Sequence, residues 1–185
     1  MKKYQDIIGN LINKGIQFDK GLSLLERTEI EKKFNITFPI ELVRLYSIGL
    51  PVSGGFYDWR NTNEDNITRI KEVLNMPLQG LIFDLESNNF WCDEFGKKPE
   101  DINDARNLLV EHYKRAPQMI PIYGHRYMPF LPNETNIPVF SIMQSDIIYY
   151  GVDLVSYLEI EFGLKQYGEL IQTNARYVDF WSDLL

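Results

Sequence analysis

The strongest constraint on the fold comes from residues 119–150, where four short apolar segments follow one another with turn residues between them. Segments rich in β-branched and aromatic side chains, bounded by Pro, Gly or Asn, are typical of β-strands. Only Gln144 and Ser145 separate the last two segments, which predicts a hairpin turn. Because successive strands joined by short turns run antiparallel, this stretch predicts an antiparallel sheet. The predicted strands cover residues 119–123, 126–128, 139–143 and 146–150.

Helical spacing and capping signals occupy most of the remaining chain. Ser23 and Glu26 match a capping box, which opens a helix that extends to about residue 34. Pro77 is predicted to lie beyond the end of a later helix, whose apolar face begins at Ile67. Asp153 is predicted to cap another helix. Further helices are predicted at residues 7–12, 39–48, 100–115 and 177–182, further strands at 81–85 and 90–92, and a short strand or ordered loop at 56–60.

Helices precede the run of strands, and a helix follows it, so the order predicts an α+β fold with helices packed on a mostly antiparallel sheet. The chain has 185 residues, a length typical of one domain, and we predict a single domain over residues 1–185. Its hydrophobic fraction of 44% excludes an intrinsically disordered chain.

Charge and composition exclude several classes of function. The net charge of −7 opposes binding to nucleic acid, whose phosphates are neutralised by Lys and Arg. It would attract a basic protein partner, and it could equally serve solubility alone. The single cysteine, Cys92, excludes an internal disulfide and fits a reducing compartment. We find no signal peptide and no apolar run long enough to cross a membrane, so a cytoplasmic protein is expected.

The sequence around His125 is the one place that resembles a catalytic centre. His125 could act as a general base with Asp146, which would make the chain a hydrolase or a transferase. No serine or cysteine nucleophile accompanies it in a recognised motif. We therefore interpret His125, Arg126 and Asp146 as residues that hold a loop against the sheet, and we predict no catalytic residue, no cofactor and no metal site. His112 and Cys92 are interpreted as core residues.

Acidic residues gather around the predicted strands at 81–85 and 90–92. Such carboxylates could bind a cation, form a solvated rim, or contact lysines and arginines of a partner. The solvated rim stays open as an alternative, and the third interpretation supplies the candidates for partner contact. The candidate partner-binding residues are the exposed members of a set that also includes acids near the preceding loop: Asp58, Trp59, Glu64, Asp65, Asp84, Glu86, Asp93 and Glu94.

With these segments in order, the chain resembles the SUKH superfamily of Smi/Knr-like domains over most of its length. Residues 29–34, 36–42, 50–51 and 56–60 carry the first part of the resemblance, residues 80–84, 89–91 and 96–99 the middle, and residues 117–151 the last part. The residues of this signature that we expect to be structural are Pro39, Trp59, Trp91, His125, Arg126, Asp146 and Gly151.

The resemblance implies a non-catalytic protein-binding domain. Bacterial members of the superfamily are typically immunity proteins, which bind and neutralise a cognate toxin that is often a nuclease. The expected function is thus that of an antitoxin with a basic toxin as its partner. The alternative that remains open is a regulatory or scaffold domain with a partner that is not a toxin.

Overall fold

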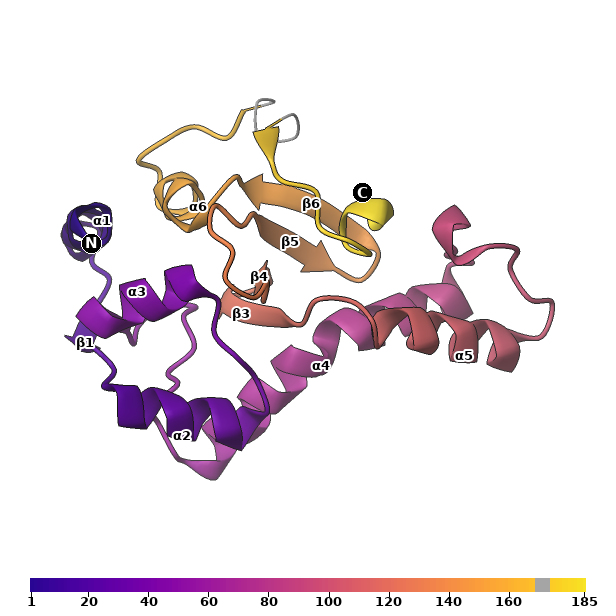
Figure 1. The fold of residues 1–185 in the computed structure, drawn as a ribbon, viewed down its shortest axis with the longest axis horizontal. Coiled ribbons are helices and arrows are strands. Elements are labelled where there is room, and N and C mark those ends of the chain that lie inside the picture. Colours follow the sequence, from indigo (N-terminus) through magenta and orange to yellow (C-terminus); the bar gives the residue numbers. More distant parts are fainter. Residues whose placement is uncertain (169–173) are drawn as a thin grey trace.

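The computed structural model describes residues 1–168 and 174–185 and confirms the predicted α+β fold (Figure 1). The helices are α1 (Lys2–Asn13), α2 (Leu24–Phe34), α3 (Ile40–Ile48), α4 (Glu64–Ser87), α5 (Ile102–Tyr113) and α6 (Leu154–Glu161), with the short 3-10 helices η1 (Asp93–Phe95) and η2 (Ser182–Leu184). The strands are β1 (Phe18–Lys20), β2 (Gly49–Pro51), β3 (Met119–Tyr123), β4 (Arg126–Pro129), β5 (Val139–Met143) and β6 (Asp146–Gly151).

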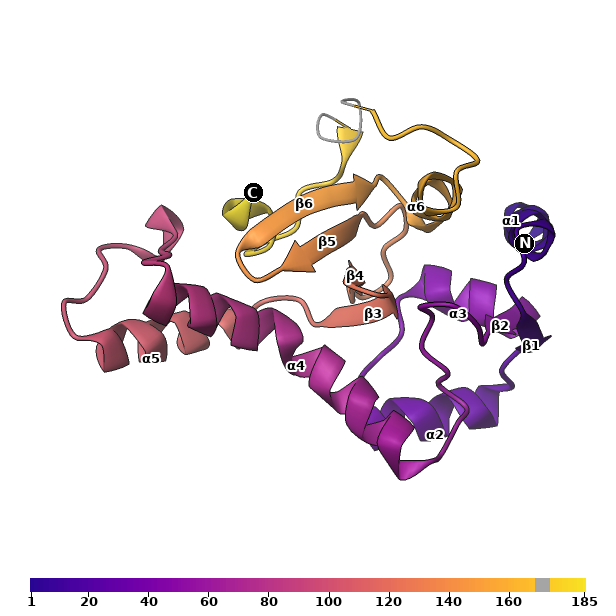
Figure 2. The same cartoon turned by 180° about the vertical axis from the view of Figure 1, so that it is seen from behind.

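The larger sheet is an antiparallel meander in the order β3-β4-β5-β6, as the sequence predicts. A two-residue turn at Gln144 and Ser145 joins β5 to β6, with Gln144 in the left-handed region at φ 59°. Strands β3, β4 and β5 are buried along nearly their whole length, whereas burial alternates along β6. Helix α4 packs against β3 and β5, and the C-terminal segment lies along β6 (Figures 1 and 2).

The N-terminal part of the chain forms a helical layer beside the sheet, with a two-stranded sheet of β1 and β2 that the sequence analysis did not predict. Helix α1 packs against α3 and α6. Glu41 of α3 is fully buried at this junction. It accepts hydrogen bonds from the Tyr4 hydroxyl at 3.4 Å and from the Ile137 amide at 3.2 Å, and Lys3 lies 3.7 Å from it. This carboxylate therefore joins α1, α3 and the segment before β5.

The prediction that a helix ends before Pro77 is wrong, because α4 continues through Pro77 to Ser87. A proline inside a helix leaves the carbonyl four residues earlier without its amide donor. That carbonyl belongs to Val73, and the buried Tyr127 hydroxyl of β4 donates to it at 3.1 Å. Tertiary structure thus replaces the hydrogen bond that the proline removes, and α4 is not interrupted.

Three other local predictions are wrong. Residues 81–85 belong to α4 and not to a strand, because the helix continues and buries Leu81, Ile82 and Leu85 on one side. Residues 90–92 form no strand. The predicted C-terminal helix at 177–182 is replaced by a turn and by η2, although the segment docks as expected, with Trp181 fully buried. The predicted caps Ser23 and Asp153 are confirmed.

Candidate functional site

Arg126, the first residue of β4, makes several bridging contacts, as the structural interpretation predicts. The Arg126 guanidinium donates to Glu161 of α6 at 3.1 Å and to the Ser141 hydroxyl of β5 at 2.7 Å. Its central carbon lies 3.9 Å from the ring centroid of Tyr150, a cation–π contact. Arg126 therefore joins β4, β5, β6 and α6.

His125 does not share this role. Its side chain is exposed and forms no hydrogen bond with the described residues; only its backbone carbonyl accepts, from the Ile142 amide at 3.0 Å. Partial desolvation and the neighbouring charge of Arg126 lower the pKa of His125, against the opposing influence of Glu161 and Asp146. The prediction that His125 and Asp146 hold the loop is wrong in this respect, because Asp146 is also exposed and only Arg126 makes the bridging contacts.

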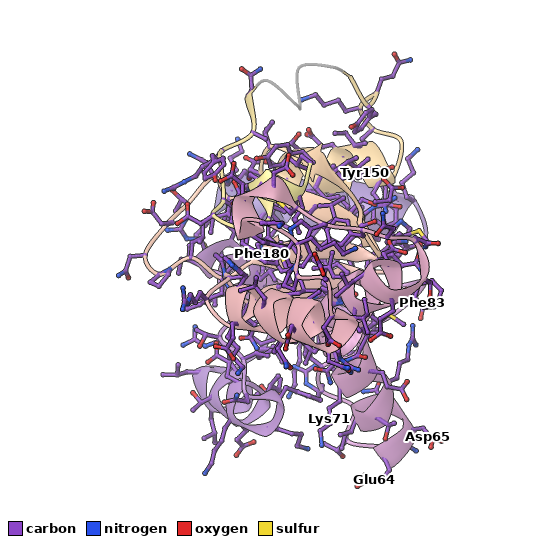
Figure 3. All side chains as sticks on the ribbon, turned by 90° about the vertical axis from the view of Figure 1, so that its right-hand side faces the viewer. Glu64, Asp65, Lys71, Phe83, Tyr150 and Phe180 are labelled. Atoms are coloured by element: carbon purple, nitrogen blue, oxygen red, sulfur yellow. The ribbon has the colours of Figure 1, made fainter. Side chains whose placement is uncertain are left out.

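The eight predicted partner-binding residues fall into two groups at opposite ends of α4. Asp58, Trp59, Glu64 and Asp65 lie at its N-terminal end, and Glu86 lies in its last turn. Since a helix rises about 1.5 Å per residue, the two groups are roughly 30 Å apart. Figure 3 shows Glu64 and Asp65 at one extremity of the molecule, far from Phe180. The predicted set therefore does not form one compact surface.

Two members of the set are buried and are not surface contacts. Trp59 is 2% exposed, and its ring is in edge-to-face contact with the rings of Phe34 and Phe38, with centroids 5.5 and 5.1 Å away. Asp84 is 4% exposed and accepts hydrogen bonds from the turn between β5 and β6. For these two residues the interpretation as partner contacts is wrong, whereas the structural role expected for Trp59 agrees with its burial.

Two further members already have partners within the chain. Asp58 accepts hydrogen bonds from the amides of Arg60 and Asn61, which shapes the loop before α4. Glu86 faces Arg106 of α5 at 3.3 Å, and both side chains are about half exposed. Both carboxylates are therefore less available to a partner protein than a carboxylate without intramolecular contacts would be.

Asp93 and Glu94 of η1 remain exposed and form no ion pair with the described residues. They lie at a cleft of about 310 Å³ that also contains the half-buried rings of Phe90 and Trp91. The opposite wall comes from the C-terminal segment. We call this feature the acidic cleft and define it by Phe90, Trp91, Asp93, Glu94, Asp183 and Leu184.

Asp183 is the residue of the acidic cleft that sequence reasoning missed, because it lies about ninety positions from Asp93. The negative charge of these carboxylates shifts the pKa values of neighbouring side chains. Burial raises the pKa of the Cys92 thiol, and the carboxylates of Asp183, Glu94 and Asp93 raise it further. The Tyr177 hydroxyl donates to Asp183, and this hydrogen bond is the main reason that the pKa of Tyr177 rises to about 12.

A series of aromatic contacts holds the two walls of the acidic cleft together. Trp91 donates from its indole nitrogen to the Gly96 carbonyl at 2.7 Å and contacts Phe95 edge to face. Phe95 stacks on Phe180, with ring centroids 5.6 Å apart, and Phe180 contacts Trp181. Phe180 adopts a φ of 69°, which is strained for a bulky side chain. Packing of this kind fixes side chains before a partner arrives, which reduces the entropy lost on binding.

His112 and Cys92 lie beneath this surface, as predicted for core residues. Phe95 stacks on the His112 ring at a centroid distance of 4.7 Å, and Cys92 is 8% exposed. The described residues include no group of three or more His, Cys, Asp or Glu side chains placed to hold a metal ion. Within the described residues, none of the helices combines the length and the apolar character that a membrane crossing needs.

Comparisons with known proteins complete the description of the site. No family model matches the chain, and neither the curated proteins nor the solved structures contain a significant match.

Proposed function

We propose that this chain is a non-catalytic immunity protein that binds and neutralises a cognate bacterial toxin in the cytoplasm, and that the toxin is a basic nuclease domain. The observation that carries the proposal is the acidic cleft, where exposed carboxylates with no ion pair in the described chain border half-buried aromatic rings. The resemblance to the SUKH superfamily supports the choice of a toxin as the partner. It rests on residues 29–34, 36–42, 50–51, 56–60, 80–84, 89–91, 96–99 and 117–151.

The chemistry of the acidic cleft suits a lysine or arginine side chain of the partner. The aliphatic part of such a side chain can pack on the rings of Phe90 and Trp91, while its charged end meets Asp93, Glu94 or Asp183. Charged hydrogen bonds of this kind are stronger than neutral ones. A partner that uses basic residues to bind nucleic acid would lose access to its substrate when those residues are occupied.

The net charge assists the encounter. A chain with net charge −7 attracts a basic protein over a distance comparable to the Debye length, about 8 Å at physiological ionic strength. Such steering raises the association rate and weakens as salt is added. An interface of standard size buries about 1,600 Å² in total, so the acidic cleft would be its centre and not its whole extent.

Co-expression with a candidate basic nuclease toxin from the native host tests the proposal, with cell growth and Kd as the readouts. The double variant Asp93→Lys, Glu94→Lys reverses two charges at the acidic cleft. The double variant Glu64→Lys, Asp65→Lys reverses two exposed acidic charges at the other end of α4 and is a matched control. We expect the wild type and the control to restore growth and the cleft variant to fail.

Different results would count against the proposal in different ways. Absence of any growth rescue by the wild type, with no complex formed, would contradict the immunity function. Rescue by the cleft variant but not by the control would contradict the site and move it to the N-terminal end of α4. A stable complex with a protein that is not toxic would favour the regulatory alternative.

A further inference from the structure

A second concave surface, opposite in charge to the acidic cleft, lies between α4 and α5. It is a groove of about 540 Å³ that also reaches the end of α2 and the approach to β3. Four half-buried apolar side chains line it, from two helices that pack side by side: Leu74 and Leu78 from α4, and Val110 and Tyr113 from α5. We call this surface the α4–α5 groove. It keeps apolar side chains partly accessible in a concave site, which is typical of a binding surface.

Both charged residues that line the α4–α5 groove are lysines. Lys71 comes from α4, on the stretch of helix between Asp65 and Phe83 (Figure 3), and it forms no ion pair with the described residues. Lys114 follows α5 and pairs with Glu111 at 2.6 Å, where both side chains are exposed. An exposed pair of this kind is weak, so Lys114 can exchange its partner at little cost.

The charge of this lining is opposite in sign to the net charge of the chain, which is −7. Lys32 lies in the last turn of α2, two residues before Phe34, which lines the groove, whereas Lys33 lines a separate pocket beside Trp59. Arg115 directly follows Lys114. Acidic residues also lie close by, since Glu72 follows Lys71 and Glu111 pairs with Lys114, but neither lines the groove. The charged side chains of the lining itself are both positive, so they complement an acidic ligand.

The α4–α5 groove has apolar side chains at its floor as well as lysines at its edge. This combination favours a polypeptide ligand over a small anion. Exposed lysines on flexible stems are a poor site for a small anion, because nothing fixes their ammonium groups around it. A polypeptide can instead bury apolar side chains between the helices while its carboxylates meet the lysines. We propose that the α4–α5 groove is a docking site for an acidic segment of a second protein, which places an apolar side chain between α4 and α5.

This proposal goes beyond the proposed function and does not depend on it. The acidic cleft attracts a basic partner, whereas the α4–α5 groove attracts an acidic one. The two surfaces therefore bind different partners, or different segments of one partner, and variants of one surface leave the other unchanged.

A fluorescein-labelled peptide can test the proposal on the full chain. The probe carries leucines at helical spacing with glutamates between them, and fluorescence anisotropy reports its Kd. One control peptide replaces the leucines by serines, and another replaces the glutamates by lysines. We expect only the Leu/Glu peptide to bind at the groove, with amide chemical shifts that move at Leu74, Leu78 and Val110.

Charge reversal in the protein completes the test. The variant Lys71→Glu changes an exposed residue and is expected to weaken binding of the Leu/Glu peptide by about tenfold or more. The matched control Lys14→Glu changes an exposed lysine at the end of α1 and should leave Kd unchanged. Circular dichroism verifies that both variants fold, and Lys114→Gln provides a second, milder change.

Three results would overturn the proposal. The first is an equal effect of Lys71→Glu and Lys14→Glu on Kd. The second is binding of the serine peptide as tightly as the leucine peptide, because the apolar floor would then play no part. The third is chemical-shift change confined to residues outside the groove.

Discussion

Replacing Asp84 by Asn should destabilise the fold far more than the same change at its neighbour Glu86. Asp84 is 4% exposed, and one carboxylate oxygen accepts from the Ser145 amide at 2.8 Å and from the Ser145 hydroxyl at 2.6 Å. The other oxygen accepts from the Asn88 side chain at 2.6 Å. The two hydrogen bonds from Ser145 join α4 to the turn between β5 and β6, and the third binds the C-cap of α4, so their loss should loosen helix and sheet together.

The expected magnitude follows from these contacts. A hydrogen bond to a charged group contributes about 1.5–3 kcal/mol, and an asparagine keeps one acceptor oxygen while its amide group faces donors. Asp84→Asn should therefore lower the free energy of unfolding by about 2–4 kcal/mol, a large share of the ~5–15 kcal/mol typical of a domain. Glu86→Gln removes only an exposed ion pair with Arg106 and should cost less than about 0.5 kcal/mol.

Urea denaturation followed by tryptophan fluorescence measures both variants, and the three tryptophans supply the signal. Although burial alone would raise the pKa of Asp84, the hydrogen bonds from Ser145 and Asn88 together lower it. Because the folded-state pKa lies below the unfolded-state value of about 3.9, the charged form stabilises the fold fully at neutral pH. The advantage of wild type over Asp84→Asn should then disappear as the pH falls through the folded-state pKa.

Two results would refute this reasoning. An equal decrease in the free energy of unfolding for Asp84→Asn and Glu86→Gln would mean that the buried hydrogen bonds of Asp84 stabilise the fold no more than the exposed ion pair of Glu86. A difference that stays constant from neutral pH to pH ~2 would mean that the charge of Asp84 plays no part.

Three further predictions address other parts of the molecule. Gly80→Ala should destabilise the fold by about 1–3 kcal/mol in thermal unfolding, because a Cβ would lie 2.7 Å from the Gln144 Cα. A Cβ at Gly9 has no atom within 4 Å, so Gly9→Ala should stabilise α1 by up to about 1 kcal/mol. A Gly9→Ala variant less stable than Gly80→Ala would contradict this account of the packing. Burial raises the pKa of Glu41 in the folded state, so protonated Glu41 stabilises the fold. This stabilisation is fully present below the unfolded-state pKa of about 4.3 and is lost as the pH rises through the folded-state pKa. The free energy of unfolding should therefore fall less between pH 4 and pH 7 in Glu41→Gln than in the wild type. An equal fall in both proteins would contradict the burial argument. Cys92, buried and with a raised pKa, should react with iodoacetamide much more slowly than free cysteine at pH 8, and equal rates would refute its burial.

Sequence patterns predicted those elements whose signals are local. Ser23 and Glu26 form the expected capping box, and Asp153 caps α6, because each of these contacts spans only three residues. The β5–β6 hairpin was predictable for the same reason, since its strands are separated by two residues. Local chemistry is sufficient where the interacting groups are close in the chain.

The candidate site was only partly predictable. Asp93 and Glu94 were identified as partner-binding candidates and are exposed at the acidic cleft. Their neighbours Asp84 and Glu86 looked equivalent in the sequence, yet one is buried and the other is half exposed. Asp183 was missed altogether, because no sequence signal relates it to η1.

By itself, the sequence determined the α+β class, the antiparallel meander, most helix starts and the acidic balance of the chain, because periodicity, capping and charge are properties of short segments. Only the tertiary structure decided that α4 continues through Pro77, where a hydroxyl from Tyr127, fifty positions away, replaces the missing hydrogen bond. It also decided which carboxylates are buried and which meet at the acidic cleft. Burial and contact depend on segments that are distant in the chain and adjacent in space, and a local pattern carries no record of them.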